Sequence, residues 1–192
     1  MRDALVAALS LNVFHRHCDR VRMANIAQIV NVLQSMILTD TKGTGHMVLT
    51  PTYHVFNMYK PFQEATYLPL DLKCDEMRVR HEMRKEMDVN KKDGFRRLPL
   101  VSASAAKTAD GSIVISLTNV ALNKAQEIEV DLEEVNAKSV TGQILTSKSE
   151  KDFNDFENPN RVQPVAFKDA KLKKGAITVN LPAKSIVILN VK

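Results

Sequence analysis

Three polar side chains form the most regular polar pattern in the first third of the sequence. Gln28, Asn31 and Ser35 lie at positions i, i+3 and i+7 of the otherwise apolar run 26–38, and this spacing places them on one face of a helix. A buried amide without partners costs roughly 1–3 kcal/mol, so these side chains need a defined environment. Two interpretations are open: they satisfy backbone groups at the end of a sheet, or they face a pocket at the carboxyl end of a barrel strand.

A second group of candidate residues combines types that can ligate metals: His15, His17, Cys18 and Asp19. The group comes at the end of a predicted helix, where a histidine interacts favourably with the helix dipole. No second ligand group follows at a matching spacing. We therefore predict neither a metal site nor a cofactor, and we interpret Cys18 and Cys74 as two buried, unpaired thiols.

Carboxylates are concentrated in the segment 76–97, which carries eight Lys or Arg residues against five acids. General acid–base catalysis requires a carboxyl group whose pKa is shifted by its environment, and nothing in this charged segment predicts such an environment. The segment is expected to be a solvated loop or a short exposed helix, with a basic binding surface as the alternative. No Ser/His/Asp or Cys/His arrangement is evident, so we assign no catalytic residue.

The elements that must position the amides flank them closely. Residues 2–14 have helix-forming types but are apolar almost all round, which is typical of a helix that is covered on every side. A short strand is expected at 21–24, and Thr50 with Pro51 is a helix start signal. The order helix, strand, apolar segment and helix is that of the end of an α/β repeat. It predicts that the chain starts within a larger domain.

From residue 65 onward the pattern changes to short strands separated by turns. Residues 66–72 alternate with a period of two, and Asp110-Gly111 is the strongest hairpin signal in the chain. Turns are expected at 173–175 and 182–184. Strands are expected at 100–107, 112–118, 127–132, 139–145, 162–167, 176–181 and 185–191. Short strands in succession without helices predict an antiparallel β-sandwich, of jelly-roll type.

Composition narrows the classes of partner. The 192 residues are 44% hydrophobic and 5% aromatic, and their net charge is +5. Lys and Arg are interleaved with acids, which argues against a nucleic-acid-binding surface. The apolar segment near the N-terminus is too short and too interrupted to span a bilayer. We therefore expect neither a nucleic acid nor a membrane as partner.

One resemblance to a known family is carried by the segments 1–7, 11–15, 19–34, 49–59, 100–105 and 154–159. These segments resemble the family 51 glycoside hydrolases, which are α-L-arabinofuranosidases, and the resemblance covers essentially the whole chain. The block 19–34 is quite specific to this family, whose fold is an eight-stranded β/α barrel followed by a β-sandwich. The resemblance thus implies a mainly β chain. Residues 1–62 would be the last helix, strand and helix of the barrel, and residues 65–192 the C-terminal β-sandwich.

The resemblance implies that the catalytic residues lie outside this chain. Its members resemble other retaining glycosidases in using two glutamates, about 5 Å apart, as acid/base and nucleophile. Both belong to barrel strands upstream of this segment, and no residue here matches either motif. The chain is therefore expected to belong to a hydrolase that acts on arabinan or arabinoxylan, but to be inactive alone. Gln28 aligns with a family glutamine that hydrogen-bonds the arabinofuranose ring, and Asn25 and Asn31 are expected in its surroundings.

Two further expectations concern the sandwich and its partners. A carbohydrate-binding module is the alternative function, but such modules present exposed aromatic rings, and from residue 98 onward only Phe153, Phe156 and Phe167 are aromatic. A structural role is therefore favoured.

The helices of residues 1–62 would expose apolar surface that a barrel would cover. This segment is expected to fold back on the sandwich or to mediate self-association as a homo-oligomer.

Overall fold

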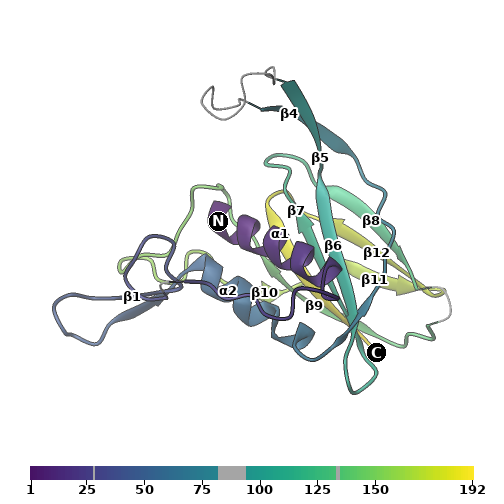
Figure 1. Ribbon diagram of the computed structural model, residues 1–192, viewed down its shortest axis with the longest axis horizontal. Coiled ribbons are helices and arrows are strands. Elements are labelled where there is room, and N and C mark those ends of the chain that lie inside the picture. The colour runs from purple at the N-terminus through teal and green to yellow at the C-terminus, as the bar shows by residue number, and fades with distance from the viewer. Residues whose placement is uncertain (28, 82–93, 133–134) are drawn as a thin grey trace.

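The computed structural model describes residues 1–27, 29–81, 94–132 and 135–192 (Figure 1). Its first part contains two helices and a small hairpin. Helix α1 spans Arg2–Arg16, strands β1 and β2 span Ile37–Thr39 and Met47–Leu49, and helix α2 spans Pro51–Met58. A 3-10 turn, η1, follows at Lys60–Phe62.

Two antiparallel sheets make up most of the remainder. The larger has six strands in the order β10-β9-β13-β7-β6-β3, and the smaller has three in the order β11-β12-β8. The bounds of the six are β10 Val165–Ala166, β9 Val140–Leu145, β13 Ser185–Val191, β7 Ile113–Asn119, β6 Val101–Lys107 and β3 Thr66–Leu68. Those of the three are β11 Ala170–Lys173, β12 Ala176–Leu181 and β8 Gln126–Asp131. A separate hairpin pairs β4 (Glu76–His81) with β5 (Gly94–Pro99).

The centre of the six-stranded sheet is covered on both faces. Strand β7 is buried at every position, because Ile115 and Leu117 face the three-stranded sheet while Val114 faces the two helices. Strands β8 and β12, whose outer face is open to solvent, alternate buried and exposed residues instead. The chain thus forms three layers: helices, six-stranded sheet and three-stranded sheet.

Helices α1 and α2 pack on the outer face of the six-stranded sheet (Figure 1). Their apolar side chains share one core with strands of the sheet, which includes Ala8, Val55, Leu145, Ile186 and Ile188. Residues 1–62 therefore do fold back on the sandwich, as one of the two expectations had it. The division of the chain at residues 62–65 into a barrel part and a sandwich part stays a prediction.

Local signals placed several elements correctly. Thr50 caps α2 by accepting a hydrogen bond from Tyr53 N at 3.4 Å. Asp110 accepts bonds from Ser112 N and Thr108 Oγ1, and Gly111 adopts φ +85°, so the β6–β7 turn forms where expected. Strands β12 and β13 have the expected bounds, and the mainly β fold class is confirmed.

Three expectations were wrong. No strand forms at 21–24, because a strand needs a neighbour for its backbone groups and the described residues offer none there. The run 26–38 is not helical: Asn31 and Gln34 have positive φ, and Val30 bridges to Ile37. The charged segment 76–97 is neither a loop nor a helix at its ends but the β4–β5 hairpin, and its centre, 82–93, lies outside the described residues.

Smaller differences concern one strand and the thiols. Strand β11 was not expected, because four residues in which Lys alternates with Ala170 and Leu172 are a weak signal. Cys18 and Cys74 are unpaired as expected, but both are half-buried rather than buried. No helix in the described ranges is long and apolar enough to cross a membrane.

Candidate functional site

The predicted site residues belong to the segment 21–34, which connects α1 to the β1–β2 hairpin. Gln28 lies outside the described residues. Asn25 is exposed and lines a cavity of about 230 Å³ between α1 and α2. Ser10 of α1 and Thr52 of α2 line the same cavity. Asn25 thus lies at an open, partly polar hollow beside the two helices.

Asn31 and Ser35 bond to nearby groups of the chain. The Asn31 side chain donates to Thr39 Oγ1 and accepts from Thr39 N, both at 2.7 Å, which closes the loop between them. The Ser35 carbonyl accepts from Thr50 Oγ1 at 2.9 Å and so ties the loop to the start of α2. Asn31, with φ 55°, therefore holds the shape of the loop 31–39.

A buried polar cluster fixes the helices on the sheet. It consists of Asn12 on α1, Tyr59 after α2, Ser104 on β6 and Ser116 on β7, and we call it the Tyr59 cluster. The Tyr59 hydroxyl lies 2.9 Å from Asn12 Oδ1 and 2.5 Å from Ser116 Oγ. Ser104 Oγ donates to the same Asn12 oxygen at 2.9 Å. Burial raises the pKa of Tyr59 to about 12, so its hydroxyl keeps the proton that it donates.

His15 extends the Tyr59 cluster toward solvent. Its Nδ1 lies 2.9 Å from Ser104 Oγ; because the Ser104 proton is directed at Asn12, the imidazole must be the donor. Burial lowers the pKa of His15 to about 4, which keeps the ring neutral at pH 7. The ring also stacks on Phe62, with centroids 4.5 Å apart. Asn12, a polar residue inside an apolar helix, was the one sequence signal for this cluster.

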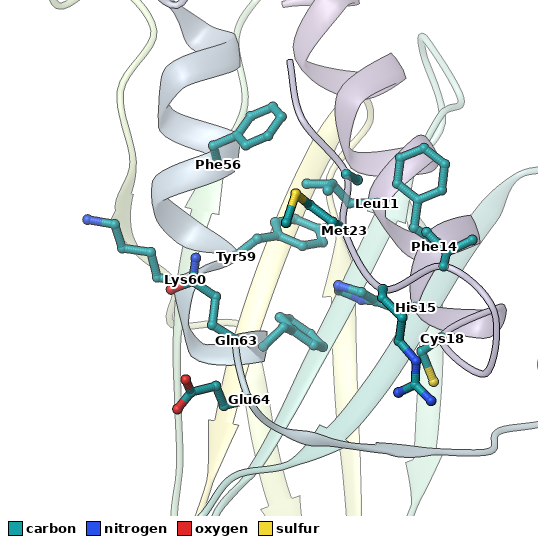
Figure 2. A pocket seen from close by; sticks show the side chains of 14 residues that line it. Leu11, Phe14, His15, Cys18, Met23, Phe56, Tyr59, Lys60, Gln63 and Glu64 are labelled. Carbon is teal, nitrogen blue, oxygen red and sulfur yellow. The ribbon is translucent and has the colours of Figure 1, made fainter. Parts of the chain in front are cut away.

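A second cavity, of about 410 Å³, opens where α1 ends beside η1 (Figure 2). His15 and Tyr59 lie at its inner side, and Cys18, Met23 and Lys60 also line it. His15 is turned toward Ser104, so the His15–Asp19 group does not converge on one point. Across the described residues, no group of three or more His, Cys, Asp or Glu side chains could hold a metal ion.

Asp75 and Glu76, two carboxylates where the charged segment begins, lie on the surface. Asp75 pairs with Lys124 at 2.6 Å, and Glu76 lies 3.6 Å from Arg97. Glu82 and Glu86 lie outside the described residues. Asp40 has a pKa lowered to about 2, because Thr44, His46 and Lys42 donate hydrogen bonds to it within the β1–β2 loop. A carboxylate held ionised in this way stabilises a turn and is a poor general acid.

The segment 21–34 and the outer side of α1 expose apolar side chains. Leu33 is 90% exposed, Met23 77% and Val6 57%. Of the three aromatic residues from residue 98 onward, Phe167 belongs to the core, whereas Phe153 and Phe156 are exposed. Val6, one of the exposed apolar side chains on α1, lines the same cavity as Asn25.

Comparisons with known proteins agree with this architecture. The family described as "Alpha-L-arabinofuranosidase C-terminal domain" matches residues 1–185. The chain is 54% identical over its whole length to an intracellular exo-alpha-L-arabinofuranosidase from Bacteroides ovatus, of which it covers 34%. It is 25% identical to an exo-alpha-(1->6)-L-arabinofuranosidase from Bifidobacterium longum, over 99% of this chain and 34% of that protein.

Solved structures of arabinofuranosidases also match this chain over about a third of their own length. The GH51 arabinofuranosidase from Xanthomonas axonopodis pv. citri matches 99% of this chain with a TM-score of 0.87 and 45% identity, over 35% of its own length. The GH51 enzyme from Thermotoga petrophila, at 23% identity and a TM-score of 0.80, shares the fold. The chain thus spans about a third of the length of the proteins that it matches. From its sequence and its fold, the chain belongs to the α-L-arabinofuranosidase C-terminal domain family, within the family 51 glycoside hydrolases.

Proposed function

We propose that this chain is the C-terminal, non-catalytic part of an α-L-arabinofuranosidase that releases arabinose from arabinan or arabinoxylan. In this proposal the sandwich is a rigid support that holds α1, α2 and the segment 21–34 against a catalytic part. The observation that carries it is that the inner side of α1 and α2 packs firmly on the sheet, while apolar side chains on the outer side are exposed. The inner side of the helices is fixed by the shared core and the Tyr59 cluster, while Leu33 and Met23 are left exposed.

Burial explains why the exposed side matters. Apolar surface gains roughly 25 cal/mol for each Å² removed from water, and monomeric proteins rarely expose contiguous apolar patches beyond a few hundred Å². The relatives have about twice this chain's length in addition to the matched part. We infer that this additional part covers the segment 21–34 and α1 and provides the two catalytic glutamates.

The site residues then have different tasks. Gln28 is proposed to hydrogen-bond the arabinofuranose ring. Asn31 closes the loop 31–39 through its two bonds to Thr39, and Asn25 lines the cavity between α1 and α2. One amide cannot cleave a glycosidic bond, since retaining hydrolysis requires an acid/base and a nucleophile together.

Two assays test the proposal. The purified chain is expected to release no 4-nitrophenol from 4-nitrophenyl α-L-arabinofuranoside, and release above the buffer rate would contradict it. The Bacteroides ovatus relative lacking the segment aligned with this chain should also be inactive. Mixing the two polypeptides should restore activity. A stable mixed complex without activity would contradict the assignment of a supporting role.

The role of Gln28 is tested in the mixed complex. Gln28→Ala should lower kcat/KM by roughly tenfold to a hundredfold, because a hydrogen bond to the substrate is lost, without changing complex formation in gel filtration. Gln143→Ala, an exposed amide on β9, is the matched control and should leave kcat/KM unchanged. An equal change in kcat/KM from the two substitutions would contradict a role of Gln28 in substrate binding.

A carbohydrate-binding role is the second candidate, and the exposure of Phe153 and Phe156 favours it. Affinity electrophoresis in gels with arabinan separates the two functions. A retarded band that Phe153→Ala and Phe156→Ala abolish would support binding. Migration of the chain without retardation would argue against carbohydrate binding and in favour of the supporting role.

A further inference from the structure

A third cavity, of about 610 Å³, lies on the helix-facing side of the six-stranded sheet. The end of α2 and the turn η1 form one wall, and strands β9, β10 and β13 form the other (Figure 1). Its volume is within the range of about 300–1,000 Å³ that is typical of small-ligand pockets. It shares no lining residue with the cavity that Asn25 lines, so the two are separate features of the fold.

The register of β9 and β13 explains why this cavity is polar. Thr141 and Asn190 lie directly opposite each other on the two strands. They are on the same face as Leu145 and Ile188, which pack in the core beneath the helices, because alternate residues of a strand share a face. Thr141 is exposed and Asn190 is half-buried. The helix-covered apolar face of the sheet thus ends in a hydroxyl group and an amide, and both line the cavity.

Four polar side chains at the cavity are free to bind a ligand. They are Asn57 and Lys60 from the helix side and Thr141 and Asn190 from the sheet, and within the described ranges their side chains form no hydrogen bond or ion pair. The Oδ1 atom of Asn190 is moreover a buried acceptor without a donor, which is destabilising. The χ2 torsion of asparagine has no steep preference, so rotation of the amide would bring this acceptor to a donor in the cavity.

The types of these groups select the class of ligand. Amides and hydroxyls both donate and accept hydrogen bonds, a combination that matches the neighbouring hydroxyl groups of a sugar. None of the described residues that line the cavity is acidic, so it lacks the carboxylates that hold a metal cation. Apolar surface for the C–H groups of a sugar ring comes from Met58, Pro61, Pro164 and Ile188.

We propose that this cavity binds a small neutral saccharide of one or two sugar units. Asn190 and Thr141 bind hydroxyl groups from the sheet, Asn57 and Lys60 bind them from the helix side, and the apolar side chains contact the ring. The inference does not depend on the proposed function, because it uses neither the segment 21–34 nor a catalytic part. It also differs from binding of a polysaccharide at the exposed phenylalanines, which do not line this cavity.

A titration of the isotope-labelled chain followed by NMR tests the proposal. L-arabinose, D-xylose, arabinobiose and xylobiose are added separately up to about 100 mM, well above the Kd of about 10 mM that a few hydrogen bonds would give. At least one of the four sugars should shift the side-chain amide signals of Asn57 and Asn190 in a saturable manner. No such shift with any of them would overturn the proposal. So would saturable shifts confined to the surroundings of Phe153 and Phe156.

Substitutions separate sugar binding from stability. Asn57→Ala and Asn190→Leu should each weaken the affinity for the sugar by roughly tenfold, because each removes a hydrogen bond to the ligand. Asn190→Leu should not lower the melting temperature, since an apolar side chain of similar volume replaces an acceptor that has no donor. Asn123→Ala, an exposed amide in the loop between β7 and β8, is the matched control and should leave the affinity unchanged. Unchanged affinity in both cavity variants, or an equal loss in the control, would contradict the assignment.

Inorganic phosphate distinguishes a saccharide site from an anion site. Among the described lining residues Lys60 is the one cation, and it is exposed. Phosphate should therefore neither shift the amide signals of Asn57 and Asn190 nor compete with the sugar, when compared with sodium chloride at equal ionic strength. Lys60→Gln, which keeps a neutral donor, should retain most of the affinity. Displacement of the sugar by phosphate, or loss of binding in Lys60→Gln, would overturn the proposal, because the cavity would then select charge.

Discussion

One hydroxyl group joins three parts of the chain at Tyr59. It reaches Asn12 on α1 and Ser116 on β7, and it is itself held at the end of α2. All three side chains are buried, so the contact is made in a low-dielectric interior where an unpaired polar group is costly. The position of α1 and α2 on the sheet therefore depends on a few polar atoms as well as on apolar packing.

Removal of this hydroxyl should destabilise the fold. Tyr59→Phe leaves Asn12 Oδ1 with Ser104 as its donor but removes the hydroxyl that Ser116 Oγ contacts in the buried interior. We expect a loss of about 1–3 kcal/mol in the free energy of unfolding, measured by urea denaturation. Tyr53→Phe in α2 makes the same chemical change at a half-buried position and should cost less than about 0.5 kcal/mol. Equal losses would show that the Tyr59 cluster adds nothing to stability.

The low pKa of His15 predicts a pH dependence. Its ring stays neutral in the folded chain down to about pH 4, whereas the unfolded chain takes up the proton near the ordinary value of 6.5. The unfolded state binds more protons between these values, so stability should fall as the pH is lowered from 6.5 toward 4. Burial also lowers the pKa of His54, which adds in the same direction.

Denaturation at several pH values tests this dependence. His15→Gln, which keeps a donor for Ser104, should flatten the slope between pH 6.5 and 4, and the exposed His46→Gln should not. Asp40 and Asp110, whose pKa values are lowered, lose their stabilising effect only at more acidic pH. An unchanged slope in His15→Gln would contradict the assignment of the shift to His15.

At the scale of elements, the close packing of β9 against β13 is the most demanding feature. A Cβ atom at Gly142 would lie 2.8 Å from Leu189 Cδ2 and 3.2 Å from the Ile188 carbonyl oxygen. Leu189 is fully buried and has no free space to move into. This glycine is therefore required by the approach of the neighbouring strand and not by its own backbone conformation.

Gly142→Ala should consequently destabilise the sandwich. Overpacking of this kind typically costs about 1–3 kcal/mol, which thermal unfolding followed by circular dichroism can measure. Thr141→Ala, at the exposed neighbouring position, is the control and should change the free energy of unfolding by less than about 0.5 kcal/mol. A neutral Gly142→Ala would mean that Leu189 repacks freely.

Strands were more predictable than the segments between the helices. β12 and β13 alternate or run apolar between clear turns, and tertiary contacts reinforce those patterns. The run 26–38 has a helical spacing of polar residues but no helix, because two residues with positive φ and the β1–β2 pairing interrupt it. Periodicity cannot distinguish these outcomes in a short apolar run.

At the scale of the whole molecule, the exposed apolar side is the feature that has no use within the chain itself. Leu33→Glu or Met23→Glu should leave circular dichroism unchanged, since both side chains are largely exposed. Each should weaken activation of the truncated Bacteroides ovatus relative by roughly tenfold or more, because a charge would be buried at the contact. Leu122→Glu, at an exposed position in the loop between β7 and β8, is the control. Equal activation by all three variants would place the contact elsewhere.

Residue patterns were enough to predict the β-sandwich, the β6–β7 turn, the start of α2 and the family. Each of these depends on residues that are close together in the chain or on motifs that survive without their surroundings. The contacts of Asn12, His15 and Tyr59 with strands β6 and β7 became visible only in the folded chain, because hydrogen bonds across some 50 to 90 positions leave no local pattern. The tertiary structure also decided that the charged segment forms the β4–β5 hairpin and that 21–24 has no strand partner. Backbone pairing depends on which strands lie alongside, and that is a property of the assembled chain.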